Sequence, residues 1–86
     1  MPEHNLNRGQ EVQVPGNITQ VIVQFTAYHN NRAQYTLTTN GGNPTGGGAI
    51  LNDGDNHVVQ LNGFNGVRNV TPNGIGGQNP IIQVRW

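Results

Sequence analysis

Apolar and polar residues alternate with a period of two along several short stretches of the chain. In QVIVQFTAY, Val21, Val23, Phe25 and Ala27 fall on one face of an extended strand, and Ile22 falls on the other. Because both faces are partly apolar, we expect this strand to lie in the middle of a sheet. The same period occurs in EVQVPG, AQYTLTT, NHVVQLNG and PIIQVRW, and no stretch shows a sustained helical period.

Residues that favour tight turns separate these stretches. They include Pro15-Gly16, Asn30-Asn31, Asp53-Gly54-Asp55, Asn62-Gly63 and Asn73-Gly74. Five to seven short strands between such turns predict an all-β fold, a small antiparallel β-sandwich. We expect one domain over residues 1–86, with residues 1–9 as a mobile N-terminus, and we interpret the Gly-rich NGGNPTGGG as a long flexible hairpin or crossover loop.

One internal similarity stands out. VQVPGNITQV, residues 12–21, resembles VQLNGFNGV, residues 59–67. Both segments read as a strand, a corner containing Gly, and the entry to a second strand. One interpretation is that the two halves of the chain contain similar hairpins that face each other, but a single pair is too few to establish a repeat architecture.

The composition is poor in charge and excludes several classes of function. Charged residues make up 9% of the chain, the net charge is +0, and the four basic residues are single arginines far apart in the sequence. Nucleic acid is therefore not expected as a partner, because its phosphates require a basic surface. No apolar run suggests membrane insertion, and the first residues lack the pattern of a signal peptide. We expect a cytoplasmic protein, or one exported without a visible signal.

The residue inventory also argues against an enzyme. The chain has no Ser, Cys or Lys, so the usual nucleophiles are missing apart from Thr and the carboxylates. Asp53 and Asp55 lie too close together within one turn to act as a separate acid and base. The spacing of His4, His29 and His57 does not indicate a shared metal site.

The stretch LNDGDNHVV leaves two interpretations open. Asn52, Asp53, Asp55 and Asn56 surround Gly54 with the hard oxygen ligands that calcium prefers. The same side chains can instead order a tight turn by accepting hydrogen bonds from their own backbone. His57 follows directly and can serve a ligand as a donor and acceptor of hydrogen bonds.

A second polar stretch, AYHNNRAQY, contains the strongest candidate site. Its central residues are Tyr28, His29, Asn30, Asn31 and Arg32. Sugars carry many hydroxyl groups and apolar C–H faces, so their sites combine planar side chains that donate and accept hydrogen bonds with an aromatic wall. The whole chain is rich in amides, with 14 Asn and 8 Gln. We therefore predict a carbohydrate site here, with Asp53, Asp55, Asn56 and His57 as its second wall if the two loops meet.

A family resemblance supports this interpretation. VQVPGNITQVIVQFTAYHNNRAQYTLTTNGG, about the first half of the chain, resembles the opening strands of the small calcium-dependent bacterial lectins that bind fucose and mannose. The resemblance implies that Asn30 ligates calcium beside the sugar, and that Asn31 and Arg32 tune the choice of sugar. The long acidic calcium loop of that family has no counterpart of equal length, and NDGDN is a reduced version of it. The metal ligands implied are Asn30, Asp53 and Asp55.

The sequence thus predicts a non-enzymatic lectin, with or without calcium, that gains avidity as a homo-oligomer. The C-terminal strand, with Ile82, Val84 and Trp86 on one face, is either an interface or ordinary core. The main alternative is a structural or assembly module without a small ligand. A third hypothesis is an ice-binding protein, based on Thr36, Thr38 and Thr39.

Overall fold

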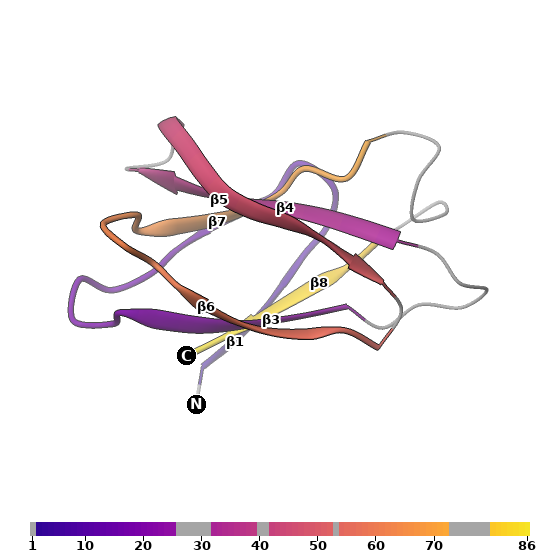
Figure 1. Cartoon of the computed structure of the whole chain (residues 1–86), viewed down its shortest axis with the longest axis horizontal. Helices are drawn as coiled ribbons and strands as arrows, with labels where there is room; N and C mark the ends of the chain where they lie inside the picture. Colours follow the sequence, from indigo (N-terminus) through magenta and orange to yellow (C-terminus); the bar gives the residue numbers. More distant parts are fainter. Residues whose placement is uncertain (1, 26–31, 40–41, 53, 73–79) are drawn as a thin grey trace.

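Two antiparallel sheets of four strands each pack face to face in the computed structural model, which describes residues 2–25, 32–39, 42–52, 54–72 and 80–86 (Figure 1). The first sheet has the order β1-β8-β3-β6 and the second has the order β2-β7-β4-β5. The strands are β1 (Glu3–Leu6), β2 (Glu11–Gln13), β3 (Gln20–Phe25), β4 (Arg32–Thr39), β5 (Gly42–Asn52), β6 (Asn56–Gln60), β7 (Gly66–Asn69) and β8 (Ile82–Arg85).

The predicted antiparallel β-sandwich is confirmed, and the central position of β3, between β8 and β6, agrees with its two partly apolar faces. The number of strands was underestimated, because the described residues form eight rather than five to seven. The sequence pattern did not reveal β1 and β5, and it indicated β7 only as a strand entry at the end of residues 59–67. Each has few large apolar residues or many glycines, and each is held by pairing with a stronger neighbour. The N-terminal segment expected to be mobile contains β1, which pairs with β8.

The core lies between the sheets and follows the alternation seen in the sequence. In β3, the side chains of Val21, Val23 and Phe25 are buried, whereas Ile22 and Gln24 are half-buried on the outer face. The second sheet contributes the buried side chains of Ala33, Tyr35, Leu37, Leu51 and Val67. Ile82 and Val84 of β8 are fully buried, so they belong to the core and not to an interface. Trp86 packs against the edge of this core and stacks on His4.

Residues 42–48 of the Gly-rich segment belong to strand β5, which pairs with β4 as an antiparallel hairpin, so the segment is not a crossover loop and its described part is not a long loop. β5 pairs with β4 from Arg32↔Asn52 to Thr39↔Gly42, with irregularities in register along the way. A side chain at Gly48 would collide with the backbone of Tyr35, and Gly47 has a φ of 64°. Glycine is therefore what allows β5 to lie so close to β4.

The two similar sequence segments form matching arches between the sheets, so the interpretation of each as a hairpin was wrong. The β2–β3 connection and the β6–β7 connection each carry the chain from one sheet to the other. Within the arches, β2 pairs with β7 and β3 pairs with β6, through Val12↔Val67 and Val21↔Val59. The sequence similarity therefore corresponds to two equivalent units that lie side by side, at the left end of Figure 1.

A buried asparagine connects elements of both sheets. The Asn69 side chain, on β7, is fully buried. Its amide nitrogen donates to the carbonyl oxygens of Leu6 (2.9 Å) and Pro80 (2.8 Å). Its oxygen accepts from the backbone nitrogen (3.1 Å) and the hydroxyl (2.6 Å) of Thr71. The Asn69 side chain thus makes four hydrogen bonds in the interior, all of them with neutral groups.

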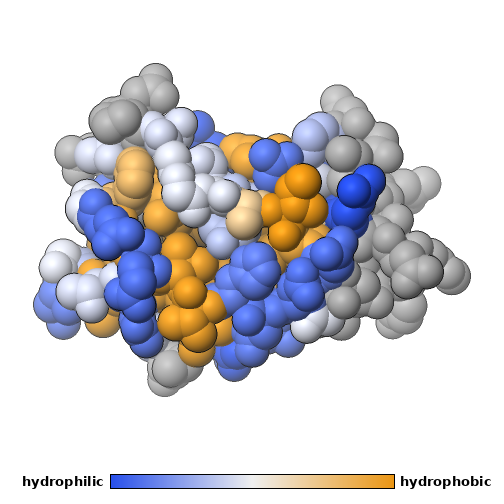
Figure 2. All heavy atoms as spheres, in the orientation of Figure 1, coloured by the Kyte–Doolittle hydropathy of each residue, from blue (hydrophilic) through white to orange (hydrophobic). Residues whose placement is uncertain are grey.

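The outer edges of the sandwich carry some exposed apolar surface. Figure 2 shows apolar residues gathered between polar ones on the side of β5 and β6, which are edge strands of opposite sheets. Ile50 and Val58 lie on these strands with 51% and 63% of their surface exposed. No helix in the described part of the chain is long and apolar enough to cross a membrane.

We expect Asn69→Ala to lower the free energy of unfolding by about 2–4 kcal/mol, because it leaves two carbonyl oxygens and one backbone nitrogen without partners in the interior. Urea denaturation measures this loss. Asn7→Ala, which removes an exposed amide from the turn after β1, is the matched control and should change stability by less than about 0.5 kcal/mol. Equal stability of the two variants would contradict the role given to Asn69.

We expect Gly48→Ala to be strongly destabilising, by about 2 kcal/mol or more, because the added carbon would overlap the Tyr35 carbonyl group. Gly16→Ala is the control, since the corresponding position there is open and the backbone is not left-handed. Thermal unfolding of the two variants tests the prediction. If Gly48→Ala unfolds at the same temperature as Gly16→Ala, β5 does not approach β4 as described.

Candidate functional site

The structure brings together the chain segments that flank the two predicted polar loops. β3 ends at Phe25 and β4 begins at Arg32, while β5 ends at Asn52 and β6 begins at Asn56. Gly54 N donates to Phe25 O (2.9 Å), Phe25 N donates to Asp55 O (3.2 Å), and Arg32 pairs with Asn52. Both loops therefore leave the same end of the sandwich, at the right of Figure 1.

We call the described part of this end the rim, which consists of Arg32, Asp55, Asn56 and His57. The side chains of Arg32 and Asn56 are exposed, and those of Asp55 and His57 are partly exposed. The other predicted site residues lie outside the described residues: Tyr28, His29, Asn30, Asn31 and Asp53. The structure thus places four of the nine predicted residues at one end of the molecule.

The Asp55 carboxylate orders its own turn. Its Oδ2 accepts a hydrogen bond from the backbone nitrogen of Asn52 (2.8 Å), and Asp55 N donates to Asn52 O (2.9 Å). Gly54 lies between them with a φ of 85°, a conformation that glycine adopts without strain. Of the two interpretations of NDGDN, these bonds favour the self-ordered turn. His57 Nε2 lies 3.9 Å from the same Asp55 oxygen.

A buried tyrosine, Tyr35, contacts the His57 side chain. The hydroxyl oxygen of Tyr35, on β4, lies 3.3 Å from Nδ1 of His57, on β6, so the contact joins the two sheets. The rings meet edge to face, with centroids 6.1 Å apart. Burial raises the pKa of Tyr35 above its ordinary value, because tyrosinate is poorly solvated in the interior. With Nδ1 occupied by the tyrosine, Nε2 is the nitrogen left to face Asp55 and the rim.

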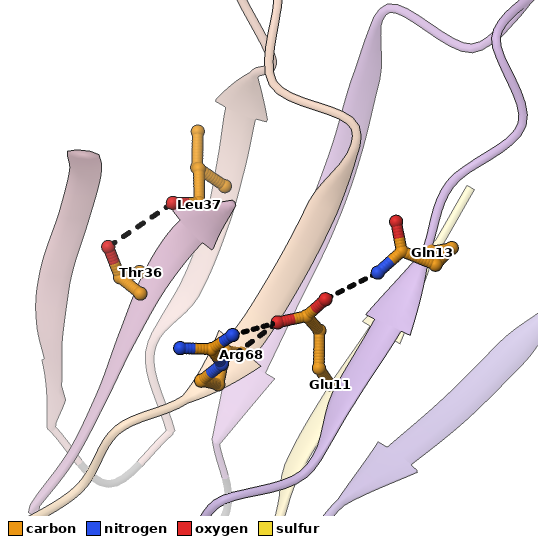
Figure 3. Close-up of polar contacts among 5 residues, drawn as sticks. All are labelled: Glu11, Gln13, Thr36, Leu37 and Arg68. Atoms are coloured by element: carbon orange, nitrogen blue, oxygen red, sulfur yellow. Dashed lines mark hydrogen bonds and ion pairs between the residues drawn. The ribbon is translucent and has the colours of Figure 1, made fainter. Parts of the chain in front are cut away.

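Two of the other arginines, Arg68 and Arg8, bond to groups of the protein away from the rim. Figure 3 shows Arg68 of β7 directed at Glu11 of β2, where Nη2 and Nε lie 2.6 and 2.8 Å from the same carboxylate oxygen. The other Glu11 oxygen accepts from the Gln13 amide. Arg8 donates to the carbonyl oxygen of Thr71 (3.0 Å). Arg32 alone among the four lies at the rim, exposed at the first position of β4.

The described residues do not bring together a metal site. Among them, no three His, Cys, Asp or Glu side chains form a group that could hold a metal ion. His4 and His57 lie on β1 and β6, the opposite edges of the first sheet. Calcium requires six to eight oxygen ligands, and the rim offers a single carboxylate, that of Asp55, already bonded to Asn52. A calcium site at Asn30, Asp53 and Asp55 therefore stays a prediction, since two of the three residues are not described.

A row of amides continues from the rim across the outer face of the first sheet. The register places Asn5 beside Gln83, Gln83 beside Gln24, and Gln24 beside Asn56. Neighbouring strands lie about 4.8 Å apart, so this row is about 14 Å long. The sequence analysis did not identify Asn5, Gln24 or Gln83 as part of one surface. The sequence does show that each of these residues occupies a polar position in its strand. Only the order and register of the strands show that they lie in one row.

The threonines proposed for ice binding do not form an exposed array. Thr38 is fully buried, and Thr36 and Thr39 are half-buried on β4, which lies inside the second sheet. The Thr36 hydroxyl donates within its own sheet, to Leu37 O and Gly46 O (3.4 Å each). A flat, exposed ice-binding strand is therefore not found at these positions.

Comparisons of the chain with protein-family models, with curated proteins and with solved structures give no match. The resemblance to calcium-dependent lectins accordingly rests on the residues quoted for it and stays a prediction.

We expect stability to depend on Tyr35 at alkaline pH. In the unfolded chain tyrosine loses its proton near the ordinary pKa of 10.0, whereas the folded protein retains it, because the pKa of Tyr35 is raised. This contribution is fully present below pH 10.0 and is lost as pH rises toward the higher folded value. The free energy of unfolding should therefore fall by up to about 1.4 kcal/mol per pH unit above pH 10.

Urea denaturation at a series of alkaline pH values measures this slope. Tyr35→Phe should flatten it, whereas Tyr28→Phe, which keeps Tyr35, should not. A slope that is unchanged in Tyr35→Phe would show that another group causes the alkaline loss.

Proposed function

We propose that the protein is a non-enzymatic lectin that binds neutral carbohydrate at the rim. One observation carries the proposal: the backbone bonds between Phe25, Gly54 and Asp55 bring the flanks of both polar loops to one end of the sandwich. The two polar stretches that the sequence analysis assigned to the site thus follow neighbouring strand ends, those of β3 and β5. Because these ends are fixed by strand pairing, the rim is positioned by a rigid framework.

The chemistry of the rim suits hydroxyl groups. The Arg32 guanidinium offers several N–H donors, Asn56 offers both a donor and an acceptor, and His57 offers Nε2. Asp55 balances the charge of Arg32, so a ligand need not carry a charge of its own. The amide row that begins at Asn56 extends this kind of surface over the first sheet.

The described residues support direct hydrogen bonding as the basis of recognition, since the Asp55 carboxylate already stabilises its turn. A single shallow sugar contact is weak, so we further propose that several copies act together. Exposed Ile50 and Val58 on the edge strands β5 and β6 support association between copies.

The same two side chains favour a second candidate function. Long edge strands with exposed apolar residues are prone to pair with another chain. In an assembly module of this kind, the edges would form the functional surface and the rim would bind no small ligand.

A glycan array probed with the purified protein, once in calcium and once in EDTA, tests the proposal. We expect binding to a small set of neutral glycans. Asn56→Ala should weaken it about three- to tenfold, because it removes one or two hydrogen bonds from an exposed position. Asn7→Ala, which removes an exposed amide next to β1, the edge strand of the first sheet opposite β6, should bind as the natural chain does.

The calcium and EDTA arms separate the two forms of the hypothesis. Binding that is lost in EDTA would support the predicted calcium ligands Asn30, Asp53 and Asp55. Binding that persists would support recognition by hydrogen bonds alone. The absence of binding in both buffers would reject the lectin and favour the assembly module.

A further inference from the structure

A cleft opens at the end of the sandwich opposite the rim, between the two arches. One wall is formed by Pro15, Gly16, Ile18 and Thr19 of the β2–β3 connection, and the other by residues 60–65, from the end of β6 through the β6–β7 connection. Its volume is about 440 Å³, which falls within the range of small-molecule sites. The candidate residues from the sequence analysis do not line it.

Backbone hydrogen bonds fix both walls. Ile18 N donates to Pro15 O (3.0 Å) and Phe64 N donates to Leu61 O (2.9 Å), so each wall contains a closed turn. Leu61 N donates to Thr19 O (2.9 Å), which joins one wall to the other. The cleft therefore exists before any ligand arrives, and binding would cost little ordering of the chain.

The lining combines a small apolar wall with neutral polar groups. Ile18 and Phe64 are half-buried and pack against the core, so they present fixed apolar surface. The side chains of Thr19, Gln60 and Asn62 are exposed and supply hydroxyl and amide groups, although the Gln60 amide nitrogen already donates to Gln20 Oε1 (2.8 Å). No charged residue occurs among the lining residues, so a charged ligand would lose hydration without gaining a partner.

Asn62 has a further distinguishing feature. It is the one non-glycine residue with a positive φ in the described part of the chain, at 51°, and it is followed by Gly63 at 97°. The turn thus holds the Asn62 amide at the mouth of the cleft in a defined backbone conformation. Glycine adopts such a conformation more easily than asparagine does, which makes Asn62→Gly a variant that removes the side chain without strain.

We infer that this cleft is a second binding site, for a neutral hydroxylated ring the size of a monosaccharide. The apolar face of such a ring would lie on Phe64 and Ile18, and its hydroxyl groups would meet Thr19, Gln60 and Asn62. The site does not depend on the rim. It is consistent with the proposed function, and if both sites act, a single chain binds glycans at both ends of its 36 Å long axis.

Nuclear magnetic resonance of the ¹⁵N-labelled full chain tests the inference. Methyl glycosides of fucose, mannose, galactose, glucose and N-acetylglucosamine are titrated one at a time. We expect at least one of them to cause saturable shifts in the backbone amides of residues 16–19 and 60–65. Asn56→Ala, at the rim, should leave these shifts unchanged.

Two substitutions with matched controls locate the binding. Asn62→Gly should weaken it about three- to tenfold through the loss of the amide, with an unchanged unfolding temperature as evidence of an intact fold. Gly16→Trp adds a large side chain to one wall at a position that has room for it and should weaken binding, whereas Gly16→Ala should bind normally.

The outcomes distinguish the cleft from the rim. Shifts confined to residues 16–19 and 60–65 support the cleft and count against the rim, and shifts in both places support two sites. Shifts confined to the rim, no shifts with any of the glycosides, or unchanged binding in both Asn62→Gly and Gly16→Trp would overturn the inference.

Discussion

The buried amide of Asn69 is the interaction on which the arrangement of the two sheets depends. It lies on β7 of the second sheet, yet it donates to Leu6 of β1 in the first sheet and to Pro80, just before β8. Thr71 bonds to its oxygen and also accepts from the backbone nitrogen of Gln34 on β4. This chain of bonds connects three strands, β7, β1 and β4, with the residue Pro80 that precedes β8. An apolar residue of similar size would fill the space but leave these carbonyl oxygens unpaired, and a carboxylate could not donate to them.

Much of the fold was predictable because its strongest strands follow the physical rule of alternation. β3 and β8 bury every second residue, as does β4 up to Leu37, so the pattern in the sequence indicates which face meets the core. β1 and β7 are four residues long, and most of their stability comes from their partners, which no local pattern encodes. β5 was missed for a different reason. Its glycines mark loops in most sequences, whereas here they allow close approach to Tyr35 on β4, a tertiary requirement.

The candidate site was predictable in composition but not in geometry. Polar residues at strand ends indicated the rim, and the pairing of Arg32 with Asn52 shows why two loops separated in sequence leave the same end. The contact between Tyr35 and His57 could not be predicted, because it joins opposite sheets. The cleft between the arches was hidden for a related reason. The similarity of residues 12–21 to residues 59–67 suggested equivalent units, but only their side-by-side pairing creates a space between them.

The position of β3 has a consequence for how a chain this small could use two sites. β3 begins at Gln20, next to the cleft, and ends at Phe25, next to the rim, so six residues of a central strand connect them. The strand spans about 20 Å and is paired on both sides, so the separation of the sites is nearly fixed. The protein would then hold two ligands, on separate chains or surfaces, at a defined distance from each other. No flexible linker between the sites would lower the effective concentration for binding the second ligand. Association between copies through the edge strands β5 and β6 would take place next to both sites, because β6 begins with the rim residues Asn56 and His57 and ends with Gln60 of the cleft.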